Sequence, residues 1–145
     1  MKLYLDNSVL NRPYDDQRQP RILLETIAFS VVLQIIEAGE AGMVRSPMHK
    51  FENDQNPFPI RRQWVEQCLR LATCVTEWND AVRNRANELQ AAGIKPCDAL
   101  HVAAAESVNA DYFLTCDDRL IRRYGGKMPV LNPTDFILLW SETKP

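Results

Sequence analysis

The sequence predicts an α/β protein with a central parallel sheet of four to five strands covered by helices on both faces. Short apolar segments that suit strands alternate along the chain with longer segments whose apolar residues recur at helical spacing. This alternation is typical of parallel sheets, whose strands are joined by crossover helices. In addition, residues 98–105 are apolar nearly all round, which predicts a helix buried against such a sheet.

The first elements follow from residue types and from the residues that end strands and helices. Residues 2–5 form an apolar run that ends at the polar Asp6, so they are expected to be the first strand. Residues 11–16 have the composition of a loop, and the apolar residues between 24 and 35 then predict an amphipathic helix. Glycines at positions 39 and 42 are expected to stop that helix.

A second strand is expected at residues 43–45, and the Ser46-Pro47 pair suits the start of a helix that would contain Glu52. The prolines at 57 and 59 break that helix. The remaining elements follow from the same criteria. Helices are expected at residues 64–72, 78–89, 96–105, in a short basic segment after 118, and at 134–139, with strands at 73–75, 112–115 and 129–131.

Length and composition indicate one globular domain, spanning residues 1–145. The chain is 46% hydrophobic and 25% charged, with a net charge of −2, a balance that excludes a disordered chain and disfavours a protein that coats nucleic acid by charge alone. No apolar run suits a signal peptide or a membrane span, so we expect a cytoplasmic protein. The four cysteines lack the close pairing of zinc or redox sites and are expected to be reduced, mostly buried thiols.

Acidic residues occur where an open α/β sheet binds ligands, beyond the carboxyl ends of its strands. Asp6 follows the first strand, Asp117 follows the strand at 112–115, and Asp98 lies in the first turn of the buried helix. Taken alone, Asp98 could be a helix-start carboxylate and Asp117 could cap the next helix, whereas Asp6 has little local backbone to satisfy. Together, however, clustered carboxylates require a proton or a cation, and their oxygen atoms favour Mg²⁺ or Mn²⁺. Such a site can hydrolyse phosphodiesters.

Three segments resemble the motifs of the PIN-domain family. They are Leu5-Asp6-Asn7-Ser8-Val9-Leu10, Asp98-Ala99-Leu100-His101-Val102-Ala103-Ala104-Ala105 and Phe113-Leu114-Thr115-Cys116-Asp117-Asp118-Arg119-Leu120. Residues 130–136 are similar to the closing strand and helix of these proteins, so the resemblance covers nearly the whole chain.

The resemblance implies a PIN-like three-layer α/β/α fold and a Mg²⁺- or Mn²⁺-dependent endoribonuclease, with RNA as substrate. It places metal ligands at Asp6, Asp98 and Asp117, and the family's second acid at Glu52. Pro47 and the polar run after Glu52 depart from the family's pattern, and Glu52 could instead lie on a helix surface. It also implies supporting hydroxyl groups at Ser8 and Thr115. Many compact members are toxins of bacterial toxin–antitoxin pairs, so a cognate antitoxin and a homodimer are implied as partners.

Other features near these motifs have two interpretations. The basic residues Arg119, Arg122 and Arg123 could bind phosphates or form an ordinary solvated helix face. The loop at 11–19 borders the expected site and could shape substrate access. His101, one turn after Asp98, is interpreted as a packed core residue.

Competing functions remain open at this stage. A haloacid-dehalogenase-type phosphatase would need a second aspartate two residues after Asp6, where the chain has Ser8. A response-regulator receiver would need an acidic pair before its phosphoacceptor and a lysine after a late strand, and this sequence has neither at the required places. A non-catalytic PIN-like module that binds RNA or protein would bind RNA equally with and without Mg²⁺. A DNA-directed nuclease is also compatible with the carboxylates, because they do not read the sugar.

Overall fold

The computed structural model describes residues 1–143 and contains a five-stranded, fully parallel sheet in the order β3-β2-β1-β4-β5. The strands are β1 (Lys2–Leu5), β2 (Gly42–Arg45), β3 (Cys74–Val75), β4 (Tyr112–Leu114) and β5 (Val130–Leu131). The helices are α1 (Asn7–Leu10), α2 (Pro20–Glu37), α3 (Pro47–Asp54), α4 (Pro59–Leu69), α5 (Asp80–Ala91), α6 (Pro96–Ser107), α7 (Asp118–Arg123) and α8 (Pro133–Thr143), with a 3-10 turn, η1, at Arg12–Tyr14.

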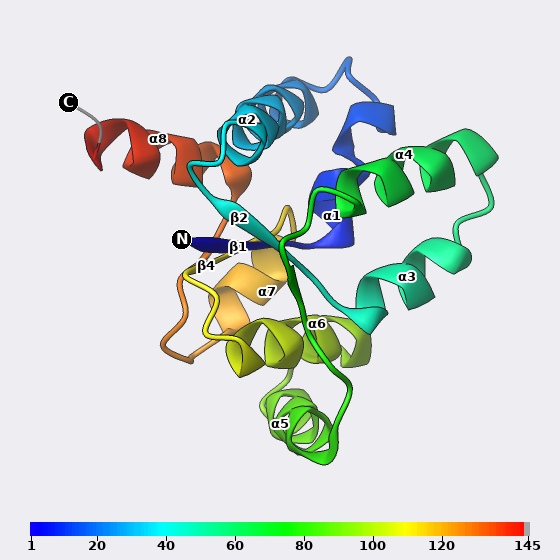
Figure 1. Ribbon diagram of the computed structural model, residues 1–145, viewed down its shortest axis with the longest axis vertical. Helices are drawn as coiled ribbons and strands as arrows, with labels where there is room; N and C mark the ends of the chain where they lie inside the picture. Colours follow the sequence, from blue (N-terminus) through cyan, green and yellow to red (C-terminus); the bar gives the residue numbers. More distant parts are fainter. Residues whose placement is uncertain (144–145) are drawn as a thin grey trace.

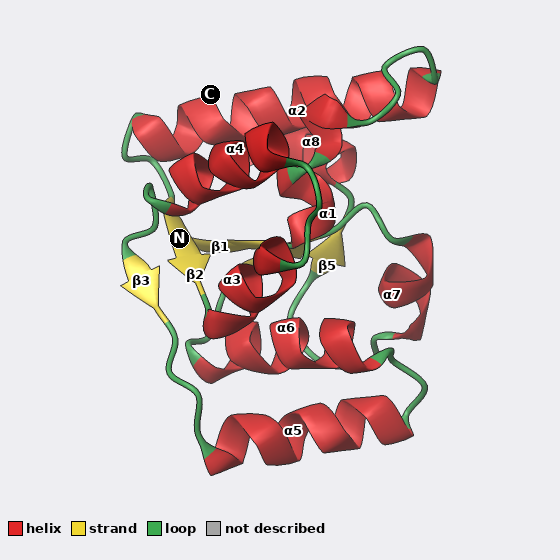
Figure 2. Ribbon diagram, turned by 90° about the vertical axis from the view of Figure 1, so that its right-hand side faces the viewer, coloured by secondary structure: helices red, strands yellow, loops and turns green. Residues whose placement is uncertain are grey.

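The helices form a layer on each face of the sheet, which confirms the predicted three-layer α/β/α arrangement. Figure 2 shows α2, α4 and α8 on one side of the sheet and α5 and α6 on the other. Each layer has its own core: Leu3 and Leu5 of β1 point into the first, and Tyr4 points into the second. This division follows from the two-residue repeat of a strand, which sends alternate side chains to opposite faces.

Because β1 is the central strand, Asp6, the residue that follows it, lies at the middle of the carboxyl edge of the sheet. Leu5 of β1 pairs with Leu114 of β4, so the residues that follow these two strands leave the sheet side by side. Helices α1 and α3 begin at the same carboxyl edge, as their positions around β1 and β2 in Figure 1 show. Residues from four different parts of the chain therefore converge at this edge.

Three local features differ from what the sequence predicted. Residues 7–10, for which no element was predicted, form the short helix α1, and this helical turn buries Val9 and Leu10 completely. Helix α2 begins at Pro20, before the first residue of the apolar repeat, since proline suits the first turn of a helix. The last helix continues to Thr143, beyond the apolar residues that predicted it.

The cysteines are all free, but only two of them are buried: Cys68 and Cys116 are buried, Cys74 is half-buried and Cys97 is exposed. The expectation that most are buried is therefore wrong for two positions. None of the helices in residues 1–143 is both long and apolar enough to span a membrane.

Candidate functional site

The four predicted acids, Asp6, Glu52, Asp98 and Asp117, line one cavity of about 490 Å³ at the carboxyl edge of the sheet. Two of them, Asp6 and Asp117, follow the ends of the adjacent strands β1 and β4. The backbone N–H of Asp6 donates to the Leu114 carbonyl at 2.9 Å, which joins the ends of these strands. Glu52 comes from α3 and Asp98 from the first turn of α6. Asp6 and Asp117, which follow the ends of β1 and β4, thus line the same cavity as the two helix carboxylates.

Asp6 is 4% exposed and is held by two hydroxyl groups. Thr115 Oγ1 donates to Asp6 Oδ2 at 2.8 Å and Ser8 Oγ donates to the same oxygen at 3.1 Å. The same hydroxyls accept backbone N–H groups, from Asp117 at Thr115 and from Cys116 at Ser8. Ser8 and Thr115 therefore fix the orientation of Asp6, which leaves its other oxygen, Oδ1, directed toward His101.

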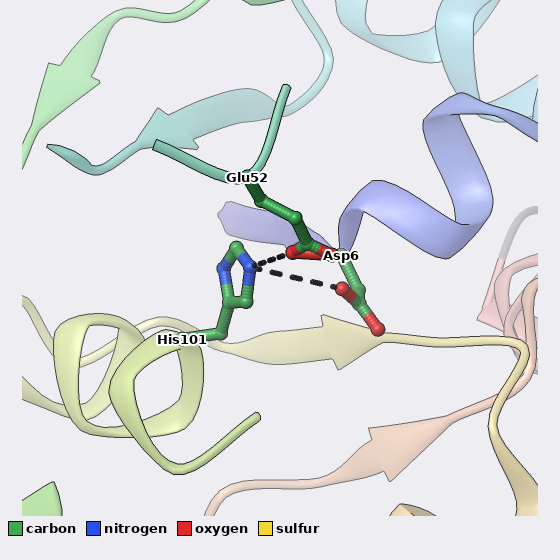
Figure 3. Close-up of side chains that lie close together, drawn as sticks. All are labelled: Asp6, Glu52 and His101. Carbon is green, nitrogen blue, oxygen red and sulfur yellow. Dashed lines mark hydrogen bonds and ion pairs between the residues drawn. The ribbon is translucent and has the colours of Figure 1, made fainter. Parts of the chain in front are cut away.

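His101 makes contacts that sequence reasoning missed. Its Nε2 lies 2.9 Å from Glu52 Oε2 and 4.0 Å from Asp6 Oδ1, and Figure 3 shows the ring directed at both carboxylates. Its Nδ1 is 2.5 Å from the hydroxyl of Tyr4. His101 is fully buried, as expected of a core residue, yet it also links the core to the cavity. The available signal was its spacing from Asp98, since residues three apart share a helix face.

The polar contacts of His101 continue into the core. The Tyr4 hydroxyl lies 2.6 Å from Ser46 Oγ, and the Ser46 N–H donates to His49 Nδ1 at 3.0 Å. Burial is the main cause that lowers the pKa of His49 to about 3, so this histidine is neutral and donates from Nε2 to the Leu5 carbonyl.

The carboxylates of the cavity influence the pKa values of His101 and of one another. Burial alone would lower the pKa of His101, but the hydrogen bond to Glu52 and the charges of Asp6, Glu52 and Asp98 outweigh burial and raise it. Burial raises the pKa of Asp6, with a further rise from Glu52 and an opposing effect from His101. A protonated His101 would offset part of the negative charge that Asp6 and Glu52 bring together.

Asp98 is half-buried, and burial, followed by the charges of Asp6 and Asp117, raises its pKa to about 6. Asp117 has the structural role that the sequence allowed, because its Oδ1 accepts the N–H of Arg119 at 2.8 Å and that of Leu120 at 3.4 Å. It nevertheless lines the acidic cavity. A helix-capping role and a place at the site are thus combined in one side chain.

The raised pKa of Asp98 predicts how the stability of the metal-free protein depends on pH. Because the folded-state pKa of about 6 exceeds the ordinary value of 3.8, protonated Asp98 stabilises the fold below pH 3.8, and this contribution is lost as the pH rises through 6. Asp98→Asn, which stays neutral, should therefore gain about 1 kcal/mol over wild type between pH 4 and pH 8, a value discounted for partial exposure.

Denaturant unfolding in EDTA at several pH values measures this difference. A constant difference between the two proteins from pH 4 to pH 8 would contradict the assignment of the raised pKa to Asp98.

The oxygen atoms around the cavity suit a divalent cation. Asp6, Glu52 and His101 each offer a ligand atom, and these atoms lie within 4.8 Å of one another. Asn7 and Asn53 also line the cavity, and within residues 1–143 the Oδ1 atoms of both are buried without a hydrogen-bond partner. Of the ligands implied from the sequence, only Asp6 belongs to this close group, while Asp98 and Asp117 line the same cavity. A set of carboxylates around one cavity suits a divalent cation.

The three predicted basic residues, Arg119, Arg122 and Arg123, do not share one environment. Arg119 lines a small cleft that Asp98, Asp117 and Lys95 also line, directly beside the acids. Arg123 borders the same cleft and donates to the Gly93 carbonyl at 3.1 Å, whereas Arg122 is exposed on α7. The structure thus brings Arg119 and Arg123 to the edge of the acidic site.

Comparisons with known proteins identify the family and the fold. A family model described as PIN domain matches residues 3–127. Among solved structures, the chain is similar to that described as VapBC2 from Rickettsia felis bound to a DNA fragment from their promoter. That likeness has a TM-score of 0.61 and 12% identity, and covers 91% of this chain and 98% of the other. It is also similar to FitAcB from Neisseria gonorrhoeae, with a TM-score of 0.55 and 13% identity over 90% of this chain and 97% of the other.

No curated protein matches this sequence. The family model spans well over half of the chain, and the chain therefore belongs to the PIN-domain family.

Proposed function

We propose that this protein is a divalent-metal-dependent endoribonuclease that hydrolyses RNA phosphodiesters. The observation on which the proposal rests is the meeting of Asp6, Glu52, Asp98 and Asp117 in one cavity at the carboxyl edge of the sheet. Asp6 is buried and the other three carboxylates are half-buried, and carboxylates gathered in this way repel one another, which supports a bound cation that offsets their charge. Membership of the PIN-domain family supports the same chemistry.

The residues of the cavity have distinct proposed roles. Asp6, Asp98 and Asp117 would hold Mg²⁺ or Mn²⁺, and Glu52 completes the acidic set beside His101. Ser8 and Thr115 keep Asp6 oriented through the hydrogen bonds described above. A bound ion would lower the pKa of a coordinated water and offset the charge of the scissile phosphate. Arg119, Arg122 and Arg123 would bind neighbouring phosphates of the RNA.

The biological role proposed for this activity is that of the toxin in a type II toxin–antitoxin pair in the cytoplasm. The motifs in the sequence resemble those of such toxins, and the fold is shared with VapBC2 and FitAcB. An antitoxin protein is accordingly the proposed partner. The exposed Leu23, Leu24 and Ile27 on α2 provide an apolar surface for the proposed homodimer.

Metal-dependent cleavage tests the proposal. Purified wild-type protein should cut single-stranded or loop-containing RNA with Mn²⁺ or Mg²⁺ and should lose this activity in EDTA. A DNA panel of the same sequences distinguishes a ribonuclease from a DNA-directed nuclease. Binding to RNA that is equal with and without metal, and without cleavage, would instead identify a non-catalytic binding module.

A further inference from the structure

A second hollow lies directly beside the acidic cavity. It has a volume of about 430 Å³ and is lined by Tyr14, Phe58, Pro59, Ile60 and Arg61, a set we call the aromatic pocket. Phe58 and Arg61 line both hollows. A chain bound across the acids would therefore extend into the aromatic pocket without leaving the protein surface.

The aromatic pocket leaves large apolar side chains open to solvent. Phe58 is 60% exposed, Ile60 69% and Tyr14 42%. Scattered apolar residues on a surface are ordinary, but a group of them that borders a hollow marks a binding site. Core packing does not account for the Phe58 ring, because most of it lies outside the core.

A guanidinium group lies against both rings of the pocket. The Cζ atom of Arg61 is 5.6 Å from the centre of the Phe58 ring and 6.0 Å from the centre of the Tyr14 ring. These separations are within the range of cation–π contacts. Aromatic rings and arginine planes are the surfaces on which proteins stack unpaired bases.

The pocket is held in place by contacts outside it. Arg61 donates from Nη1 to Asp15 Oδ1 at 3.1 Å and from Nη2 to the Tyr14 carbonyl at 2.6 Å. Asp15 also pairs with Arg12, and the backbone N–H of Phe58 donates to Asn56 Oδ1 at 3.1 Å. The loop at 11–19 thus helps to fix the pocket, and a preformed surface loses less entropy when it binds a ligand.

We propose that the aromatic pocket is a subsite in which a base of single-stranded RNA stacks on Phe58, next to the phosphate bound at the acids. This inference rests on the proposed nuclease function and adds to it a subsite for one base of the substrate. Bases in a duplex are already stacked on one another, so only an unpaired base can enter the pocket. Stacking is tolerant of sequence, because every base has a π-face.

The continuity of the two hollows favours a nucleotide over a side chain from a partner protein. A phosphate held at the acids places its neighbouring nucleoside within reach of Phe58 and Arg61, which line both hollows. Arg61 is already paired with Asp15, so its part in the subsite is to pack against the two aromatic rings.

Fluorescence anisotropy with a labelled single-stranded RNA tests the subsite. The full chain with Asp98→Asn serves as the non-cleaving background. Adding Phe58→Ala should weaken binding about tenfold, whereas Phe58→Trp, which keeps an aromatic face, should bind within about twofold of the background. Trp78→Ala removes an aromatic side chain that is 49% exposed elsewhere, and its effect should be below about twofold. Because Phe58 is largely exposed, thermal unfolding should show that all variants fold.

The outcomes separate the subsite from the nuclease proposal. Equal RNA affinity with and without the Phe58 ring would overturn the subsite, and a partner protein as occupant would give this result. Wild-type cleavage measured on the same preparations decides the nuclease proposal independently. A loss of affinity in Phe58→Ala, together with no metal-dependent cleavage by wild type, would retain the RNA subsite and reject the nuclease.

Discussion

Replacing Asp6 or Asp98 with asparagine is expected to reduce metal-dependent RNA cleavage about a thousandfold, equivalent to roughly 4 kcal/mol of lost transition-state stabilisation. Asparagine keeps the size of the side chain but removes the charge that would hold the cation. Ser8 and Thr115 would still orient the side chain in Asp6→Asn. The uncharged amide of that variant would nevertheless be a weaker ligand for the cation than the carboxylate. Initial rates at saturating Mn²⁺, with circular dichroism of each variant, measure the effect.

A matched control comes from the last helix. Asp135 is an exposed carboxylate in the first turn of α8, and Asp135→Asn should retain the wild-type rate. Variants of Asp6 and Asp98 that cut RNA as fast as Asp135→Asn would show that the acids do not act in cleavage.

Glu25→Ala is expected to lower the free energy of unfolding by about 3 kcal/mol and the melting temperature by roughly 10 °C. The Glu25 side chain is 1% exposed, lies 2.9 Å from Arg12 and accepts a hydrogen bond from Asn132. Removal of the carboxylate leaves these donors incompletely paired in the interior, which costs more than a surface pair would. Since Arg12 also binds Asp15, the change should loosen the loop that supports Arg61.

The same helix provides the control for this prediction. Glu37 is an exposed residue at the end of α2, and Glu37→Ala should change the free energy of unfolding by less than about 0.5 kcal/mol. Denaturant unfolding of both variants distinguishes them. A Glu25→Ala protein as stable as Glu37→Ala would mean that the buried pair contributes little to the fold.

The strands and the acids at their ends were predictable because both depend on local pattern. Apolar runs that end in a polar residue located β1 and β4, and the geometry of parallel sheets then brought Asp6 and Asp117 to one edge. The Ser46-Pro47 helix start predicted the helix that contains Glu52, and the family resemblance assigned Glu52 to the site; the structure places it at the same cavity.

The remaining features depend on contacts between distant segments, which no local pattern specifies. Glu25 lies within the apolar repeat of α2, and its partners come from η1 and from the turn before α8. The contact between His101 and Glu52 joins residues 49 positions apart, and its distance depends on how α3 packs on α6. The aromatic pocket likewise forms where η1 meets the start of α4.

Calorimetric titration of Mn²⁺ into metal-free wild type and Asp6→Asn is the most direct measurement of whether the gathered carboxylates form a cation site. We expect saturable binding to wild type and an affinity lower by at least about tenfold in Asp6→Asn, because a buried ligand with fixed orientation is lost. Equal affinities for the two proteins, or no binding to wild type, would contradict the account.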